Sequence, residues 1–287
     1  MGQKDISEKL LEDYNDVFAD IVDVLLFDGD EVIKEEDLSP STIRSQYKAD
    51  DRKLHEQERD IAKIWKEKGI CIALIGIENQ TGEDKDMPLR VIGYEGVSHR
   101  SQVLGNNTIR YPVITLILYF GDKPWSGPRS LSECFQVPDT LIDFFNDYRM
   151  HVVDVPFLAE SQIAKFKSDF AVIADYFHQV AETGRYVPNP RQINHVDAVL
   201  KFLNAFTKDD RFAEVADEAR NEGKEVKTMC DVLDRVENRG LEKGGNLMIY
   251  SLVADGDLSP EKGAKRLFIS VDSLKKNMEQ EGYKFPK

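Results

Sequence analysis

The clearest chemical signal in the sequence is a carboxylate at the end of an apolar segment. Residues 70–77 form an almost unbroken apolar run, typical of a buried strand, and Glu78-Asn79-Gln80 follow it. A carboxylate at the end of a buried strand costs free energy unless it is paired or bound to a metal. Glu78 and Gln80 are two residues apart, so on a strand their side chains face the same side and Asn79 faces the other.

A second carboxylate, Asp60, precedes this segment on a predicted short strand, residues 60–65, and a turn at Lys68-Gly69 can bring it beside Glu78. Two carboxylates at one end of a sheet can hold Mg²⁺ and leave positions for water and for a phosphate oxygen. The metal would lower the pKa of a bound water and neutralise charge on a phosphate. In the alternative interpretation, Glu78 pairs with a nearby Lys or Arg at a strand end.

The tripeptide Glu78-Asn79-Gln80 is a weak signal by itself, and matches to the related pattern Glu-x-Lys occur elsewhere in the chain. Residues 222–224 and 225–227 match it, but they lie in a charged stretch that we interpret as a solvated helix surface. What distinguishes Glu78 is therefore the apolar strand before it and the acid in the preceding element.

The composition favours a folded protein and limits the classes of partner that it can bind. With 41% hydrophobic and 31% charged residues, the 287-residue chain can form a core. The sequence shows neither an apolar run of the ~18 residues needed to span a bilayer nor a signal peptide, so we expect a cytoplasmic protein without a membrane partner. The net charge of −14 counts against nucleic-acid binding, but residues 60–130 carry nine basic and eight acidic residues.

Cysteines and histidines give no metal signature. The three cysteines, Cys71, Cys134 and Cys230, are far apart and form no CxxC motif, so no structural zinc site is expected. The five histidines form no HExxH or similar pair, and we interpret them as surface or packing residues. They are His55, His99, His151, His178 and His195.

Periodicity predicts an α/β fold. Helices are expected over residues 5–27 and 88–104, strands over 60–65, 70–77, 113–120 and 150–158, and a charged loop with short irregular elements over 28–59. From residue 159 the spacing becomes helical, with one helix to about Val180, a second around residues 193–203, and a charged stretch over 207–228. This order predicts a mixed sheet with helices on its faces, in a domain spanning 1–206, followed by a helical region spanning 207–287.

The C-terminal region ends in two predicted short helices. Ser259-Pro260 and Ser270 are typical helix starts, and the pair resembles a helix-turn-helix unit with Lys275 and Lys276 on its second helix. The alternative is a helical cap or an oligomerisation tail, and a homo-oligomer is an open expectation.

Several motifs, in order and spacing, resemble the Rpn family of recombination-promoting nucleases, also described as putative transposases. The resemblance covers about residues 10–245. It rests on Asp16-Val17-Phe18, Asp60, Glu78-Asn79-Gln80-Thr81, Pro88-Leu89-Arg90, Tyr94, Tyr111-Pro112-Val113-Ile114, Leu118-Tyr119-Phe120-Gly121 and Arg239–Gly244.

The resemblance implies a restriction-endonuclease-like fold of the PD-(D/E)xK superfamily and cleavage of DNA with Mg²⁺, Mn²⁺ or Ca²⁺. It implies Asp60 and Glu78 as metal ligands, with Gln80 where the superfamily usually has lysine, a departure that occurs within the Rpn branch. The backbone carbonyl of Asn79 is a further candidate ligand, and Asp16 a candidate for a water-mediated contact. Arg90 and Tyr94 are accessory candidates.

These observations predict a metal-dependent DNA endonuclease associated with recombination, mobile elements or phage defence, with Asp60, Glu78 and Gln80 as catalytic residues. One alternative is an inactive nuclease fold that binds DNA or protein. Another is a regulator whose C-terminal helices bind DNA. A further expectation is a positive rim beside the carboxylates, drawn from Lys63, Lys66, Arg90 and Arg100.

Overall fold

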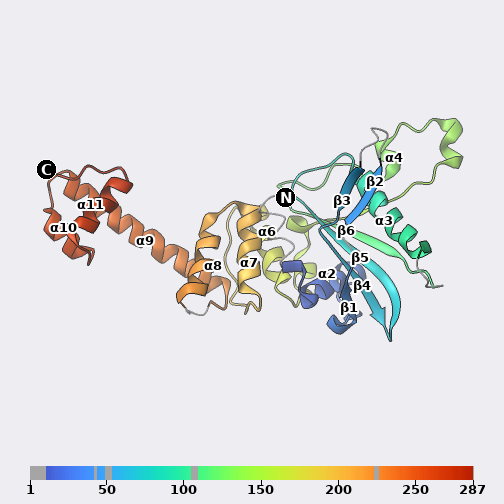
Figure 1. Ribbon diagram of the computed structural model, residues 1–287, viewed down its shortest axis with the longest axis horizontal. Coiled ribbons are helices and arrows are strands. Elements are labelled where there is room, and N and C mark those ends of the chain that lie inside the picture. Colours follow the sequence, from blue (N-terminus) through green and yellow to red (C-terminus); the bar gives the residue numbers. More distant parts are fainter. Residues whose placement is uncertain (1–10, 42–43, 49–53, 105–108, 223–225, 287) are drawn as a thin grey trace. The chain divides into compact units, whose positions relative to one another are not determined.

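The computed structural model divides the chain into two compact units, Met1–Met229 and Cys230–Lys287 (Figure 1). The first unit contains the sheet and most of the helices, and the second is helical. This confirms the expected mixed α/β class with a helical C-terminal region. The structure describes residues 11–41, 44–48, 54–104, 109–222 and 226–286, with the backbone alone for 44–48, 54–58 and 219–222.

A five-stranded mixed sheet forms the centre of the first unit. Its strand order is β1-β4-β5-β6-β7, where β1–β4 and β4–β5 pair antiparallel and β5–β6 and β6–β7 pair parallel. The strands are β1 (Leu38–Pro40), β4 (Ile61–Glu67), β5 (Ile70–Gln80), β6 (Val113–Tyr119) and β7 (His151–Asp154). The long apolar runs are β5 and β6, which occupy the buried middle of the sheet, as their composition predicts.

A two-residue turn and a β-bulge together set the register between β4 and β5. Lys68 and Gly69 both have positive φ, 50° and 81°, as in the tight hairpin turns that match the twist of the flanking strands. The turn pairs Glu67 with Ile70, and a β-bulge between Trp65 and Lys66 then shifts the pairing by one residue, so that Ile61 lies opposite Ile77. Asp60, the residue before β4, therefore lies at the same end of the hairpin as Glu78.

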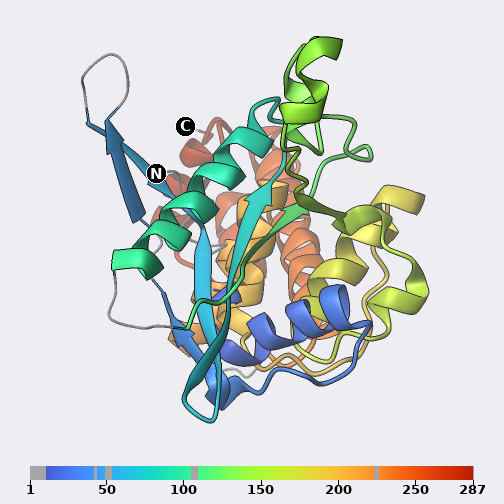
Figure 2. The same ribbon diagram turned by 90° about the vertical axis from the view of Figure 1, so that its right-hand side faces the viewer.

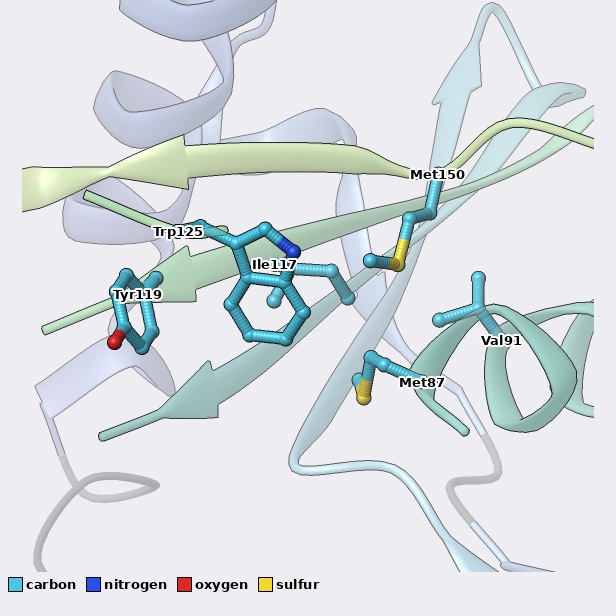
Figure 3. Close-up of a cluster of buried hydrophobic side chains, with 6 residues drawn as sticks. All are labelled: Met87, Val91, Ile117, Tyr119, Trp125 and Met150. Carbon is cyan, nitrogen blue, oxygen red and sulfur yellow. The ribbon is translucent and has the colours of Figure 1, made fainter. Parts of the chain in front are cut away.

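Helix α3 (Met87–Leu104) covers one face of the sheet. Figure 2 shows it lying across the strands, and Figure 3 shows its Met87 and Val91 facing Ile117 of β6. Tyr119, Trp125 and Met150 complete this buried cluster. In the parallel register Glu78 pairs with Ile117 and Gln80 with Tyr119, so both side chains face the same side as α3.

The opposite face is covered by α2 (Asn15–Phe27), α6 (Phe170–Thr183) and α7 (Val196–Thr207). Phe120, which follows β6, packs against Phe177 of α6 at 5.1 Å between ring centroids. It also lies 5.5 Å from Phe202 and 4.6 Å from Phe206, both on α7. These rings extend the core from the sheet into the helical layer.

The remaining elements are short or lie toward the C-terminus. They are η1 (Glu35–Asp37), the hairpin β2 (Arg44–Lys48) and β3 (Leu54–Glu58), α4 (Leu131–Cys134), η2 (Asp139–Phe144), η3 (Val155–Phe157), α5 (Glu160–Ile163), α8 (Asp210–Glu222), α9 (Met229–Ala254), α10 (Pro260–Arg266) and α11 (Val271–Gln280). Within the described residues, no helix combines the length and the apolar composition that a membrane span requires.

The structure corrects several sequence expectations, and the first two concern strands. Residues 28–59, expected to be loop, contain β1 and the β2–β3 hairpin, because edge strands can form from polar residues through backbone pairing alone. The strand expected over 150–158 ends at Asp154, and Pro156, which lacks an N–H, lies in η3.

The helix expected from residue 159 is divided into α5 and α6. The backbone N–H groups of Lys167 and Ser168 donate to the Asp20 carboxylate of α2, at 2.9 and 2.8 Å. A tertiary contact therefore replaces helical hydrogen bonds at this point. The Glu-x-Lys matches at 222–227 include residues 223–225, which lie outside the described residues.

Helix α8, which the sequence assigned to the C-terminal region, packs against α7 of the first unit. The boundary between the compact units accordingly falls after Met229 instead of after residue 206. The second unit has its own core, built from the C-terminal half of α9 with α10 and α11. Ser259 and Ser270 cap α10 and α11 by accepting hydrogen bonds from the N–H groups of Lys262 and Ser273, which confirms both predicted helix starts.

Gly263 allows α10 to pack closely within this unit. A Cβ atom at this position would lie 2.7 Å from Val253 Cγ2 and 3.3 Å from Leu274 Cδ2. We expect Gly263→Ala to destabilise the unit by roughly 1–3 kcal/mol through overpacking, seen as faster hydrogen exchange in α10 and α11. Gly240→Ala on α9 is the matched control, because its added Cβ meets nothing within 4 Å. Equal exchange in both variants would contradict the packing role of Gly263.

Candidate functional site

Glu78 is the central residue of the candidate site. Its side chain is 1% exposed, and its Oε1 atom is fully buried with no hydrogen-bond partner among the described residues. Burial, with a smaller contribution from the Asp60 carboxylate, raises the pKa of Glu78 to about 8, against the opposing effect of Arg90 and Arg59. A buried acceptor without a donor is destabilising in a folded protein, so this oxygen favours a proton or a bound cation.

Asp60 lies beside Glu78 at the ends of adjacent strands. It is half-buried, and its Oδ2 atom accepts a hydrogen bond from the backbone N–H of Asn79 at 2.8 Å. This bond orients the Asp60 carboxylate toward the end of β5, where it raises the pKa of Glu78 by charge repulsion. Two carboxylates are thus held together although the charge of Asp60 disfavours ionisation of Glu78.

Gln80 and Asn79 face opposite sides of β5. Gln80 is half-buried and pairs in register with Tyr119, on the side of Glu78 and α3. The Asn79 side chain points to the α2 side, where its Nδ2 donates to Glu12 Oε2 at 2.7 Å. Glu12 is a fully buried acid that sequence reasoning missed, because it lies among other acids near the start of an amphipathic helix pattern.

Arg90 and Tyr94 reach the site from α3. One guanidinium nitrogen of Arg90, Nη2, is 3.6 Å from Glu78 Oε2 and donates to Tyr94 Oη at 3.2 Å. Its Nη1 donates to Asp84 Oδ2 at 2.9 Å. The four-residue spacing of Arg90 and Tyr94 places them on one face of the helix. Both accessory candidates from the sequence therefore contact each other, and Arg90 lies next to Glu78.

Arg59 is a second cation beneath the site that the sequence did not indicate. It is 2% exposed, its guanidinium carbon lies 5.5 Å from the centre of the Tyr94 ring, and neither terminal nitrogen has a hydrogen-bond partner within the described part of the chain. Burial lowers the pKa of Arg59, whereas Glu95 and Glu78 raise it. The residue belongs to a charged stretch before Asp60, where nothing distinguishes it from a surface arginine.

The structure places Asp16 away from Glu78 and the candidate site. Its carboxylate Oδ2 lies 3.0 Å from Nε2 of His195, whose ring stacks on Tyr14 at 3.6 Å. Asp16 belongs to α2, on the face of the sheet opposite Glu78. The acid of this N-terminal region that contacts the end of β5 is Glu12.

Contrary to the sequence prediction, Lys63 is not part of a positive rim beside the carboxylates. This lysine is 2% exposed, and its ammonium group donates to Asp13 O at 2.5 Å and to Asn15 Oδ1 at 2.7 Å. A buried lysine engaged with α2 cannot contact a phosphate at the surface. Arg90, whose side chain is 36% exposed, is the basic residue of that group that contacts Glu78.

The arrangement fits a divalent cation bound by oxygen. Carboxylates of Asp60 and Glu78 are hard oxygen ligands of the kind that Mg²⁺ takes, with water and substrate oxygens filling the other positions. A cation beside Glu78 Oε1 would satisfy this buried acceptor and offset the repulsion between the two acids. The residues present therefore fit the metal that the sequence predicted.

Taken together, the fold and this site define a mixed α/β protein with a pair of carboxylates at adjacent strand ends. The model of the family described as "Putative transposase, YhgA-like" matches residues 51–209, which is more than half of the chain. The chain belongs to this family, and the match confirms the resemblance found in the sequence. Among curated proteins and among solved structures, no match to the chain was found. Apart from Glu12, the site residues described above lie within the matched range.

Proposed function

We propose that this protein is a metal-dependent DNA endonuclease with Asp60, Glu78 and Gln80 as its catalytic residues. Membership of a transposase family is consistent with a nuclease-like role in mobile elements and with DNA as a partner. The finer assignment, phosphodiester hydrolysis in recombination, mobile elements or phage defence, rests on the site.

The single observation that supports the proposal most strongly is the state of Glu78. A carboxylate that is 1% exposed, has one oxygen without a hydrogen-bond partner and lies beside Asp60 is destabilising in the metal-free protein. A fold keeps such a group when it serves binding or chemistry, because perturbed carboxylates concentrate at functional sites.

Asp60 and Glu78 would hold the cation, together with the backbone carbonyl of Asn79. Mg²⁺ is the expected ion, and Mn²⁺ or Ca²⁺ can take similar oxygen ligands. When bound, the ion supplies Lewis-acid chemistry: it lowers the pKa of a water ligand and neutralises phosphate charge.

The chain's own residues account for orientation and charge. Arg90 is half-exposed and is held by Asp84 and Tyr94, so its guanidinium is oriented to contact a phosphate oxygen near Glu78. Gln80, on the same face, can donate to a phosphate or accept from water but carries no charge. The positive charge that lysine supplies elsewhere in the superfamily would come here from Arg90, with Arg59 beneath.

The experiment that tests the proposal is cleavage of supercoiled plasmid by the full chain. We expect conversion to nicked or linear DNA with Mg²⁺ or Mn²⁺ and none with EDTA. Cleavage that persists in EDTA, or DNA that stays intact with every ion while the cation binds, would contradict the proposed activity.

The second candidate function is a nuclease fold that binds DNA or protein without cutting. The observation that favours it is Gln80, an uncharged residue at the usual position of lysine, in a chain of net charge −14. The binding module predicts a DNA complex that weakens steeply with salt, together with intact plasmid in every metal.

Gln80→Lys tests how much this position matters. The substitution places an ammonium group on the face of Glu78, where the superfamily usually has one, so we expect plasmid cleavage to be retained within about tenfold. Gln80→Ala removes both hydrogen-bonding groups and should reduce the rate by about 10²-fold or more. Equal rates for Gln80→Ala and the wild type would remove Gln80 from the catalytic residues.

A further inference from the structure

A second group of metal-ligating side chains lies on α5 and α6. Among the residues that the structure describes, Glu160, His178 and Glu182 form a group in which one ligand atom from each lies within 4.8 Å of the others. Their elements differ from those that carry Asp60 and Glu78. The sequence did not reveal the group, because His178 and Glu182 share only the four-residue spacing and Glu160 lies on a separate helix.

The ring of His178 is fixed in one orientation. Its Nδ1 atom lies 3.3 Å from the carbonyl oxygen of Pro156 in η3, and a carbonyl can only accept, so Nδ1 carries the hydrogen. In the neutral ring the lone pair is therefore on Nε2. A histidine whose Nδ1–H is held by a backbone carbonyl is the usual form of a metal-binding imidazole.

The Nε2 atom has no hydrogen-bond partner within the described residues, and His178 as a whole is 9% exposed. The nearest acid, Glu182, has its Oε2 atom 3.7 Å away, which is beyond hydrogen-bond distance. The lone pair of Nε2 and the carboxylates of Glu160 and Glu182 are all acceptors. Acceptors that face one another require a proton or a metal ion between them.

We propose that Glu160, His178 and Glu182 bind a transition-metal dication of the Zn²⁺ class. Imidazole nitrogen favours such an ion over Mg²⁺, and two carboxylates complete a three-ligand set. Neighbouring ligand atoms around tetrahedral zinc are about 3.3 Å apart, so the side chains must move closer than 4.8 Å. Both glutamates are exposed and can rotate, while His178 is already in place.

The surroundings leave room for water on the ion. The group lines a pocket of about 390 Å³, to which Tyr186, Asn189 and Arg191 also contribute. A bound ion would connect α5 to α6, while the Pro156 carbonyl anchors the same histidine to η3. The site therefore ties the segment that leaves β7 to the helical layer, and metal binding stabilises the native unit.

The test is a Zn²⁺ titration of the full chain, without a histidine tag, against a competing chromogenic chelator. Asp60→Asn and Glu78→Gln are present in every sample, so that the proposed catalytic site cannot bind the ion. The titration therefore reports the His178 group alone, and its result does not depend on whether the proposed nuclease function is correct. We expect about one Zn²⁺ per chain and a rise in melting temperature at saturation. Glu160→Gln and Glu182→Gln, both at exposed positions, should each weaken binding by about tenfold or more.

His195→Gln is the matched control, because His195 also faces a carboxylate, that of Asp16, but lies outside the group. It should bind Zn²⁺ as tightly as the parent. No stoichiometric binding, or binding that is unchanged in Glu160→Gln and Glu182→Gln, would overturn the proposal. A proton shared between His178 and Glu182 would then account for the geometry.

Discussion

Glu78→Gln is expected to abolish metal-dependent DNA cleavage. The amide has nearly the same shape as the carboxylate but removes the charge from a site whose acids are Asp60 and Glu78. Loss of metal activation and of phosphate neutralisation together costs several kcal/mol, which corresponds to a rate at least ~10³-fold lower. Asp60→Asn should have a similar effect, and its carbonyl can still accept the Asn79 N–H.

Glu67→Gln is the matched control, since Glu67 is an exposed acid on the same β-hairpin and its carboxylate is 4.0 Å from the exposed Lys68. We expect plasmid cleavage at the wild-type rate, measured with the same metal and with folding checked by circular dichroism. A folded Glu78→Gln variant that cuts as fast as Glu67→Gln would show that the site is wrongly placed.

The same substitution should stabilise the metal-free protein, increasingly so as the pH rises. Folding raises the pKa of Glu78 from its ordinary value of 4.5 to about 8. The folded state therefore binds a proton that the unfolded state has lost between these values, and wild-type stability falls as the pH rises through this range. Glutamine does not ionise, so the advantage of Glu78→Gln grows across about pH 5–8 and is constant above it.

One pH unit corresponds to about 1.4 kcal/mol, so the full effect is a few kcal/mol. It is measured by urea unfolding in EDTA near pH 6 and near pH 9. Glu67→Gln should stay within about 0.5 kcal/mol of the wild type at both values, as surface substitutions usually do. An advantage of Glu78→Gln that shrinks toward alkaline pH would contradict the buried, cation-free state of this carboxylate.

The sequence predicts the parts of the fold that depend on local pattern. The apolar runs identify β5 and β6, and Lys68-Gly69 identifies the turn that brings Asp60 to the same end of the hairpin as Glu78. The two-residue period then places Glu78 and Gln80 on one face. These three features, each set by neighbouring residues in the chain, place the centre of the site at one end of the hairpin. The one-residue shift at the bulge between Trp65 and Lys66, which brings Asp60 opposite Glu78, was not predicted.

Features that depend on distant contacts could not be predicted in this way. Arg59 and Glu12 become part of the site only because α3 and α2 cover opposite faces of the sheet. The break between α5 and α6 depends on Asp20, about 150 residues earlier in the chain. His178 likewise meets Glu160 through the path of the chain after β7, so its spacing in the sequence carries no metal signature.

The central claim is that Asp60 and Glu78 hold a divalent cation, and a Mg²⁺ titration of the melting temperature tests it most directly. Mg²⁺ suits carboxylate oxygens and not the His178 group, so this titration reports binding at Asp60 and Glu78 and not at the proposed zinc site. Above about pH 8, where Glu78 is ionised, the wild type should gain about 2.7 kcal/mol of stability at a hundredfold excess over Kd. Glu78→Gln should gain none. An equal gain in both proteins, or none in the wild type, would contradict the claim.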